Sequence, residues 1–150
     1  MPRKNKKLPR HLLVIRTSAM GDVAMLPHAL RALKEAYPEV KLTVATKSLF
    51  HPFFEGLDVG FLDIETRRTH RGTRGAIRFA REAAELKIDA VADMHNVLRS
   101  KMVRAALHLR GIPVSVIHKG RIEKYMRLGR GSEGVKPLKH TVIRYCDVFR

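Results

Sequence analysis

Residues 12–46 read LLVIRTSAMGDVAMLPHALRALKEAYPEVKLTVAT and outline a strand, a helix and a second strand. The near-continuous apolar run at 12–16 is typical of a strand covered on both faces of its sheet, and 41–46 is a second strand by the same reasoning. Between them, apolar residues recur at helical spacing: Leu26, Ala29, Leu30, Leu33 and Tyr37. This order predicts a right-handed crossover within a mainly parallel sheet.

The rest of the chain repeats this alternation. Further strands are predicted at 60–65, 90–95 and 114–118. Two further helical stripes consist of Ile77, Ala80, Ala84 and Ile88, and of Val103, Ala106, Leu107 and Leu109. The segment 47–59, rich in Phe around Pro52, predicts a short broken helix. We therefore expect an α/β fold, a Rossmann-like parallel sheet with helices on both faces, formed by a single domain at 12–150 after a basic tail at 1–11.

The charge of the chain points to an anionic partner. Thirty Lys and Arg stand against fourteen Asp and Glu, for a net charge of +16. Such a surplus favours phosphate, nucleic acid or lipid head groups. Cys146 is the only cysteine, which excludes an intrachain disulfide. No apolar run reaches the roughly 18 residues of a membrane span, so we expect a protein that is not integral to a membrane.

Asp22 lies where the first strand passes into the first helix, and two interpretations are open. It could cap the helix, with Gly21 supplying a positive φ and Pro27 near the first turn. Alternatively it could act as a general base, because ligands of doubly wound sheets bind at the carboxyl ends of the strands. The loop lacks the glycines of a dinucleotide site and the Gly-Lys-Ser/Thr of a P-loop, which disfavours both classes.

Several stretches resemble the glycosyltransferase family 9 heptosyltransferases. Residues 12–46 resemble the start of that family, with its Ser/Thr-x-x-Gly-Asp-Val turn after an apolar strand. IDAVADMHNVLRSKMV at 88–103 and RGIPVSVIHKGR at 110–121 resemble its later strands in order and spacing. His95 corresponds to a position where the family has His or Gln. The family often has a Gly at the next position, where this chain has Asn96. The resemblance runs from about Leu12 to Phe149.

The resemblance implies the N-terminal, acceptor-side half of a GT-B enzyme that transfers heptose from ADP-heptose to the lipopolysaccharide inner core with inversion. It places Asp22 as the catalytic base, with Ser18 and Gly21 in the same loop, and it implies neither cofactor nor metal. Asp93 and His95 are interpreted as the end of a buried strand, with at most an acceptor contact. The expected location is the cytoplasm, with peripheral contact to the inner membrane as an option.

Basic residues cluster in two parts of the chain. Six arginines and no acid lie between Glu65 and Glu82, and a second basic cluster lies between Asp93 and Glu133. Those expected on helices are interpreted as solvent-facing: Arg78, Arg81, Arg99, Lys101 and Arg104. The loop residues are the candidates for binding an anionic acceptor, since guanidinium groups bind carboxylates and phosphates bidentately: Arg67, Arg68, Arg71, Lys119 and Arg121.

Two other function classes remain open. A nucleic-acid-binding module fits the charge, although no known nucleic-acid motif appears and only 6% of residues are aromatic. A noncatalytic Rossmann-like interaction domain is the other.

A last apolar stripe predicts a helix that still runs at the end of the sequence and needs a continuation or a partner: Val142, Tyr145, Cys146 and Phe149. Since nothing resembles the second GT-B domain, we expect the ADP-sugar site to be missing. The 150-residue chain alone is then expected to be inactive.

Overall fold

The computed structural model describes residues 8–118 and 140–149, and it confirms the predicted fold class. The strands are β1 (His11–Ile15), β2 (Lys41–Thr46), β3 (Gly60–Asp63), β4 (Ala90–Asp93) and β5 (Val114–Val116). The helices are α1 (Met20–Ala36), the short 3-10 helix η1 (Ser48–Phe54), α2 (Gly72–Glu85), α3 (Leu98–His108) and α5 (Thr141–Val148). All strand pairs are parallel, in the order β3-β2-β1-β4-β5.

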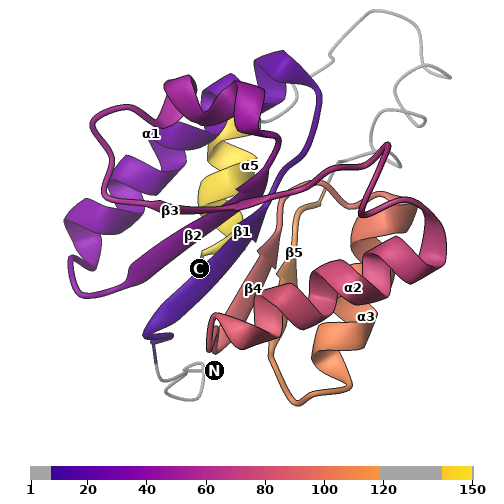
Figure 1. The fold of residues 1–150 in the computed structure, drawn as a ribbon. Helices are drawn as coiled ribbons and strands as arrows, with labels where there is room; N and C mark the ends of the chain where they lie inside the picture. Colours follow the sequence, from indigo (N-terminus) through magenta and orange to yellow (C-terminus); the bar gives the residue numbers. More distant parts are fainter. Residues whose placement is uncertain (1–7, 119–139, 150) are drawn as a thin grey trace, which may run out of the picture.

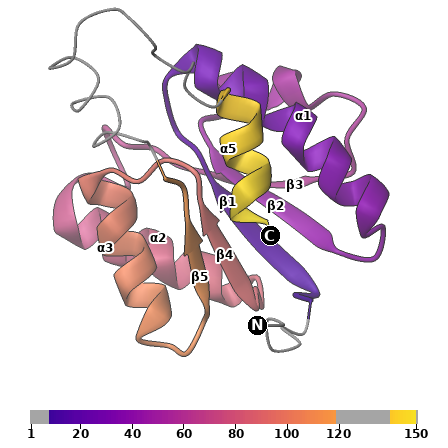
Figure 2. The same cartoon turned by 180° about the vertical axis from the view of Figure 1, so that it is seen from behind.

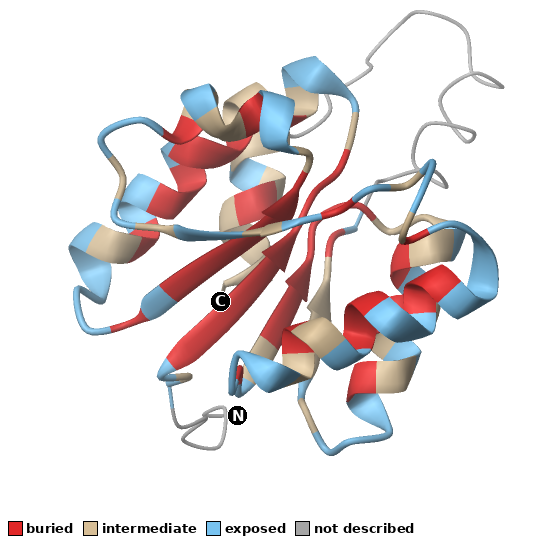
Figure 3. Ribbon diagram, viewed as in Figure 1, coloured by how far each residue is buried: buried red, intermediate tan, exposed pale blue. Residues whose placement is uncertain are grey.

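Helices cover both faces of the sheet (Figures 1 and 2). One core lies between the sheet and α1, η1 and α5, and the other lies between the sheet and α2 with α3. β1 occupies the centre of the sheet and is buried along its whole length (Figure 3). This burial on two faces explains why the sequence of β1 is an unbroken apolar run after its first residue.

The strand order defines an expected ligand position at the carboxyl ends of β1 and β4, which we call the crevice. From β1 the chain proceeds through α1 to β2 on one side, whereas from β4 it proceeds through α3 to β5 on the other. The order therefore reverses between these two neighbouring strands, and in open α/β sheets ligands bind outside the carboxyl ends at such a point. The segments after β1 and β4 are consequently the first places to look for a site.

Two of the predicted helical stripes were partly wrong. Ile77 is 50% exposed, and α2 instead buries Gly75, Ala76, Phe79, Ala80 and Ala83. Leu109, which follows the end of α3, is 87% exposed. Both predictions included a large aliphatic side chain, Ile77 or Leu109, in the buried face of the helix. Shape complementarity with the neighbouring elements decides which face of a helix is buried. Small residues on this face let α2 lie close to α3.

The stripe of the last helix has its partner within the described chain. α5 packs against α1 (Figure 2), Tyr145 is completely buried, and Cys146 and Phe149 contact the core on that face. The expectation that this face needs a further partner is therefore not supported by the described residues. None of the described helices is both long and apolar enough to cross a membrane.

Candidate active site

Asp22 lies in the first turn of α1, and the helix-cap interpretation of this residue was wrong. The N-cap position is Ala19, whose side chain makes no capping hydrogen bond. Gly21 lies within the helix and is absent from the glycines of positive φ, which are Gly56, Gly72 and Gly111 in the described chain. Asp22 still complements the positive end of the helix dipole, but its carboxylate has another partner.

That partner is Arg16, the residue directly after β1. Its guanidinium donates from Nη1 to the carbonyl oxygen of Met94 at 2.5 Å and from Nη2 to Oδ2 of Asp22. Only 8% of the Arg16 side chain is exposed. Because a buried guanidinium is stable only with hydrogen-bonding partners, these two contacts tie the ends of β1 and β4 to the start of α1.

The carboxylate of Asp22 is held in place yet accessible. Its side chain is 37% exposed, and Arg16 engages only Oδ2. No residue of the described ranges donates a hydrogen bond to Oδ1. One oxygen is thus oriented by a buried cation while the other has no described donor on a partly exposed side chain, an arrangement suited to accepting a proton from a bound hydroxyl group.

Asp93, at the end of β4, organises the neighbouring turn. Its Oδ1 accepts the backbone N–H groups of His95 at 2.9 Å and Asn96 at 2.8 Å, and its Oδ2 accepts from Arg104 at 3.0 Å. Asp93 is completely buried. With all these contacts directed into the protein, its carboxylate fixes the turn after β4. The prediction that Arg104 faces solvent was wrong, since its side chain is 24% exposed and pairs with Asp93.

The turn after β4 faces the loop after β1. Oγ of Ser18 lies 3.5 Å from Nε2 of His95, which is 7% exposed. The predicted loop residue Ser18 is therefore beside the same crevice as Asp22. His95 belongs to this crevice as well, which the sequence pattern left open. No group of three metal-ligating side chains occurs within residues 8–118 and 140–149.

A residue from the far end of the chain also reaches Asp22. The hydroxyl of Tyr145 donates to the backbone carbonyl of Asp22 at 3.0 Å. Burial raises the pKa of Tyr145 to about 12, so this hydroxyl keeps its proton at neutral pH. The sequence signalled Tyr145 only as part of an apolar stripe. Its contact with Asp22 could not be anticipated.

The candidate acceptor arginines lie on the connection from β3 to α2. Arg67, Arg68 and Arg71 are exposed. The connection is anchored by His70, whose Nδ1 accepts the backbone N–H of Glu65 at 3.0 Å and whose Nε2 donates to Glu82 at 2.9 Å. No described contact joins these arginines to Asp22. Their role stays a prediction, and Lys119 and Arg121 lie outside the described residues.

Sequence reasoning missed Arg16, although a usable signal was present. A charged side chain directly after a fully buried strand requires a buried partner. The first acid that follows it in the chain is Asp22, six residues later. The pair could therefore have been proposed from the sequence, whereas the contact of Arg16 with Met94 depends on the pairing of β1 with β4.

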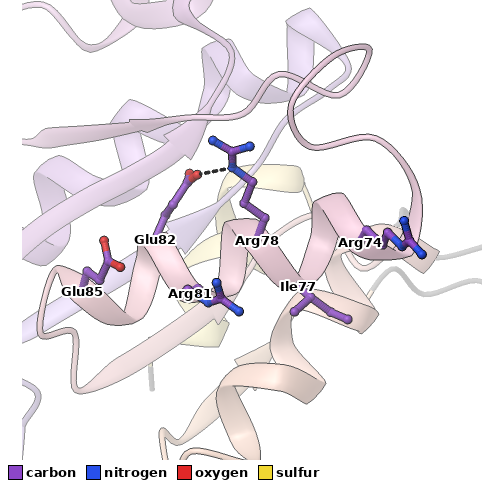
Figure 4. A pocket seen from close by; sticks show the side chains of 6 residues that line it. All are labelled: Arg74, Ile77, Arg78, Arg81, Glu82 and Glu85. Atoms are coloured by element: carbon purple, nitrogen blue, oxygen red, sulfur yellow. Dashed lines mark hydrogen bonds and ion pairs between the residues drawn. The ribbon is translucent and has the colours of Figure 1, made fainter.

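A second surface feature lies along α2 (Figure 4). It is a depression of about 520 Å³ lined by Arg74, Ile77, Arg78, Arg81, Glu82 and Glu85. All six residues come from one helix, and Glu82 already accepts from Arg78 at 3.1 Å. The feature is a solvent-facing side of α2, as expected for Arg78 and Arg81, and we assign it no role in the site.

No family model matches the chain, and no curated protein matches it in sequence. Solved structures do match. The E. coli heptosyltransferase WaaC, solved with ADP, is 25% identical with a TM-score of 0.60, over 93% of this chain and 45% of that one. The E. coli ADP-heptose lipopolysaccharide heptosyltransferase II is 21% identical with a TM-score of 0.63, over 93% and 40%. A family 9 glycosyltransferase from Veillonella parvula is 15% identical with a TM-score of 0.71, over 97% and 42%.

The structural neighbours of this chain are family 9 glycosyltransferases. The resemblance predicted from the sequence motifs is thereby confirmed at the level of the fold, and the chain forms a glycosyltransferase-like domain. It spans between 40% and 45% of the length of these three neighbours.

Proposed function

We propose that this chain is the acceptor-side domain of an inverting glycosyltransferase, with Asp22 as the general base. The observation that carries the proposal is the geometry of the Asp22 carboxylate. Oδ2 is held by a buried guanidinium, Oδ1 has no donor among the described residues, and the side chain is 37% exposed at the carboxyl ends of β1 and β4. In a single displacement at an anomeric carbon, the attacking hydroxyl must lose its proton, and a carboxylate so placed can receive it.

We further propose that the donor is ADP-heptose or a related ADP-sugar. The support is the similarity to WaaC, whose solved structures include one with ADP and one with ADP-2-deoxy-2-fluoro heptose. Following the two-domain enzymes that the sequence resembles, we place the donor in a second Rossmann-like domain of the whole protein. The proposed acceptor is an anionic lipopolysaccharide core sugar, reached from the cytoplasmic side of the inner membrane.

A transfer assay tests this proposal. The longest natural form of the protein is incubated with ADP-heptose and a lipopolysaccharide inner-core acceptor, and the product is analysed by mass and by the configuration of its new glycosidic bond. The proposal requires a product extended by one heptose with inverted anomeric configuration. Retention of configuration contradicts it, because a retaining reaction needs a nucleophile rather than a general base.

The exposed arginines of the β3–α2 connection should contribute to acceptor affinity. We expect the triple change Arg67→Gln, Arg68→Gln and Arg71→Gln to raise the KM for the acceptor about tenfold or more and to leave the KM for the donor within about twofold. The reason is that charge-assisted hydrogen bonds to the acceptor are lost in ground and transition states alike. Steady-state kinetics with each substrate varied in turn measures this.

The matched control for these arginines is Arg74→Gln with Arg81→Gln, which removes two arginines of α2 that are also exposed. Both acceptor and donor constants should stay near those of the wild type in this control. Equal changes in the two KM values of the triple variant would show that the loop arginines do not select the acceptor.

A further inference from the structure

α5 reaches the candidate base from a position more than one hundred residues away in the chain. The helix packs against α1, and Tyr145 is its completely buried member. The phenol hydroxyl donates to the carbonyl oxygen of Asp22 at 3.0 Å. This contact acts on the backbone of Asp22, whereas Arg16 acts on its carboxylate.

The first turn of α1 is anchored by the buried side chain of Val23 but lacks a side-chain cap. Its N-cap, Ala19, provides no side-chain hydrogen bond. Pro27, inside the helix, has no N–H to donate to the carbonyl of Val23, the residue next to Asp22. A helix start without a cap and with a break in its hydrogen-bond ladder is prone to local opening. A buried donor to the first turn of α1 should therefore reduce local opening more than it would in a regular, capped helix.

The Tyr145 hydroxyl is well suited to be that donor. Burial is the main cause of its raised pKa, while the nearby Arg16 charge opposes the rise and the Asp22 charge adds to it. The phenol consequently stays protonated throughout the neutral range. Phe at this position would retain the packing of the ring and lose only the hydrogen bond.

We propose that Tyr145 is a positioning residue for Asp22: together with Arg16 it fixes the backbone and the carboxylate of the base relative to the crevice. This proposal rests on the proposed function, because it assumes that Asp22 performs proton transfer. It assigns α5 a part in the site in addition to its part in the core. Tyr145 touches no substrate in this proposal and acts only through Asp22.

The test compares Tyr145→Phe with Tyr37→Phe, which removes the same atom from an exposed tyrosine next to the other end of α1. In the longest natural form of the protein, Tyr145→Phe should lower kcat about two- to tenfold with the acceptor KM unchanged, as expected for one neutral hydrogen bond. Tyr37→Phe should leave both constants unchanged. A rise in acceptor KM with normal kcat overturns the proposal, since it indicates a binding role.

A double-mutant comparison separates positioning from a general structural effect. If Tyr145 acts through Asp22, then Tyr145→Phe should cause no further loss of kcat when Asp22 is already Asn. A loss of the same size in both backgrounds overturns the proposal. An Asp22→Asn variant with full activity instead refutes the proposed function itself, so the two failures give different results.

Amide hydrogen exchange supplies a readout that does not depend on activity. The first hydrogen-bonded amides of α1, from Val23 to Leu26, should exchange about two- to tenfold faster in Tyr145→Phe than in the wild type or in Tyr37→Phe. The amides of β4 serve as the internal reference and should not change. Unaltered exchange of the amides from Val23 to Leu26 overturns the proposal whatever the kinetics show.

Discussion

Replacing Asp22 by Asn should lower kcat for sugar transfer by about 10²–10⁴-fold, because Asn cannot take the proton that the acceptor hydroxyl loses. Asn is isosteric with Asp, and its amide oxygen can still accept from the Arg16 guanidinium, so the fold should be retained. The measurement is kcat at saturating concentrations of both substrates, together with the urea midpoint of unfolding.

The control for this prediction is Asp58→Asn. The Asp58 side chain is 97% exposed and pairs with Lys34 at 3.1 Å, so the change removes an ion-paired carboxylate that is remote from the crevice. Its kcat should match the wild type. A loss of only a few fold for Asp22→Asn, with a normal unfolding midpoint, would assign proton transfer to another group. A large loss of stability would instead mean that Asp22 mainly holds α1 in place.

Replacing Arg16 by Gln should have the second-largest effect. We expect kcat to fall about 10²-fold, because the carboxylate of Asp22 loses the group that orients it and misplacement by about 1 Å can cost that much. We also expect a destabilisation of about 1–3 kcal/mol, since the carbonyl of Met94 loses its buried donor. Transfer kinetics and urea unfolding measure the two effects separately.

Two further variants sharpen the Arg16 prediction. Arg16→Lys keeps the positive charge but lacks the planar fork that serves Met94 and Asp22 together, so its kcat should lie between those of the wild type and of Arg16→Gln. Arg31→Gln removes an exposed guanidinium from the same helix as Asp22, one that donates to the carbonyl of Glu55 at 3.4 Å, and should change neither measurement. If Arg16→Gln is destabilised yet keeps its kcat, then Arg16 has a structural role alone.

Much of the fold could be predicted because its signals are local. Each strand and the stripe of α1 depend on residues that are neighbours in the chain, and their periodicity decides between strand and helix. The alternation of these elements then restricts the connections to right-handed crossovers in a parallel sheet. The position of Asp22 at the first crossover, and hence its place at the crevice, followed from the same pattern.

The buried faces of α2 and α3 could not be predicted in the same way. A stripe built on Ile77 gives α2 a plausible apolar face, yet the structure exposes Ile77 and buries the small residues beside it. Periodicity alone does not determine how closely two helices can approach. That depends on the shape of α3, which contributes the opposite surface of the contact.

By itself, the sequence determined that this protein builds a parallel sheet with Asp22 after its central strand, because those properties depend on contacts and propensities within short segments. Only the tertiary structure decided what surrounds Asp22. Arg16 is six residues away in the chain, but Met94 and Tyr145 are 78 residues from Arg16 and 123 residues from Asp22 respectively. Contacts over such separations depend on strand order and helix packing, and no local pattern encodes which donor will meet which carbonyl when the core closes.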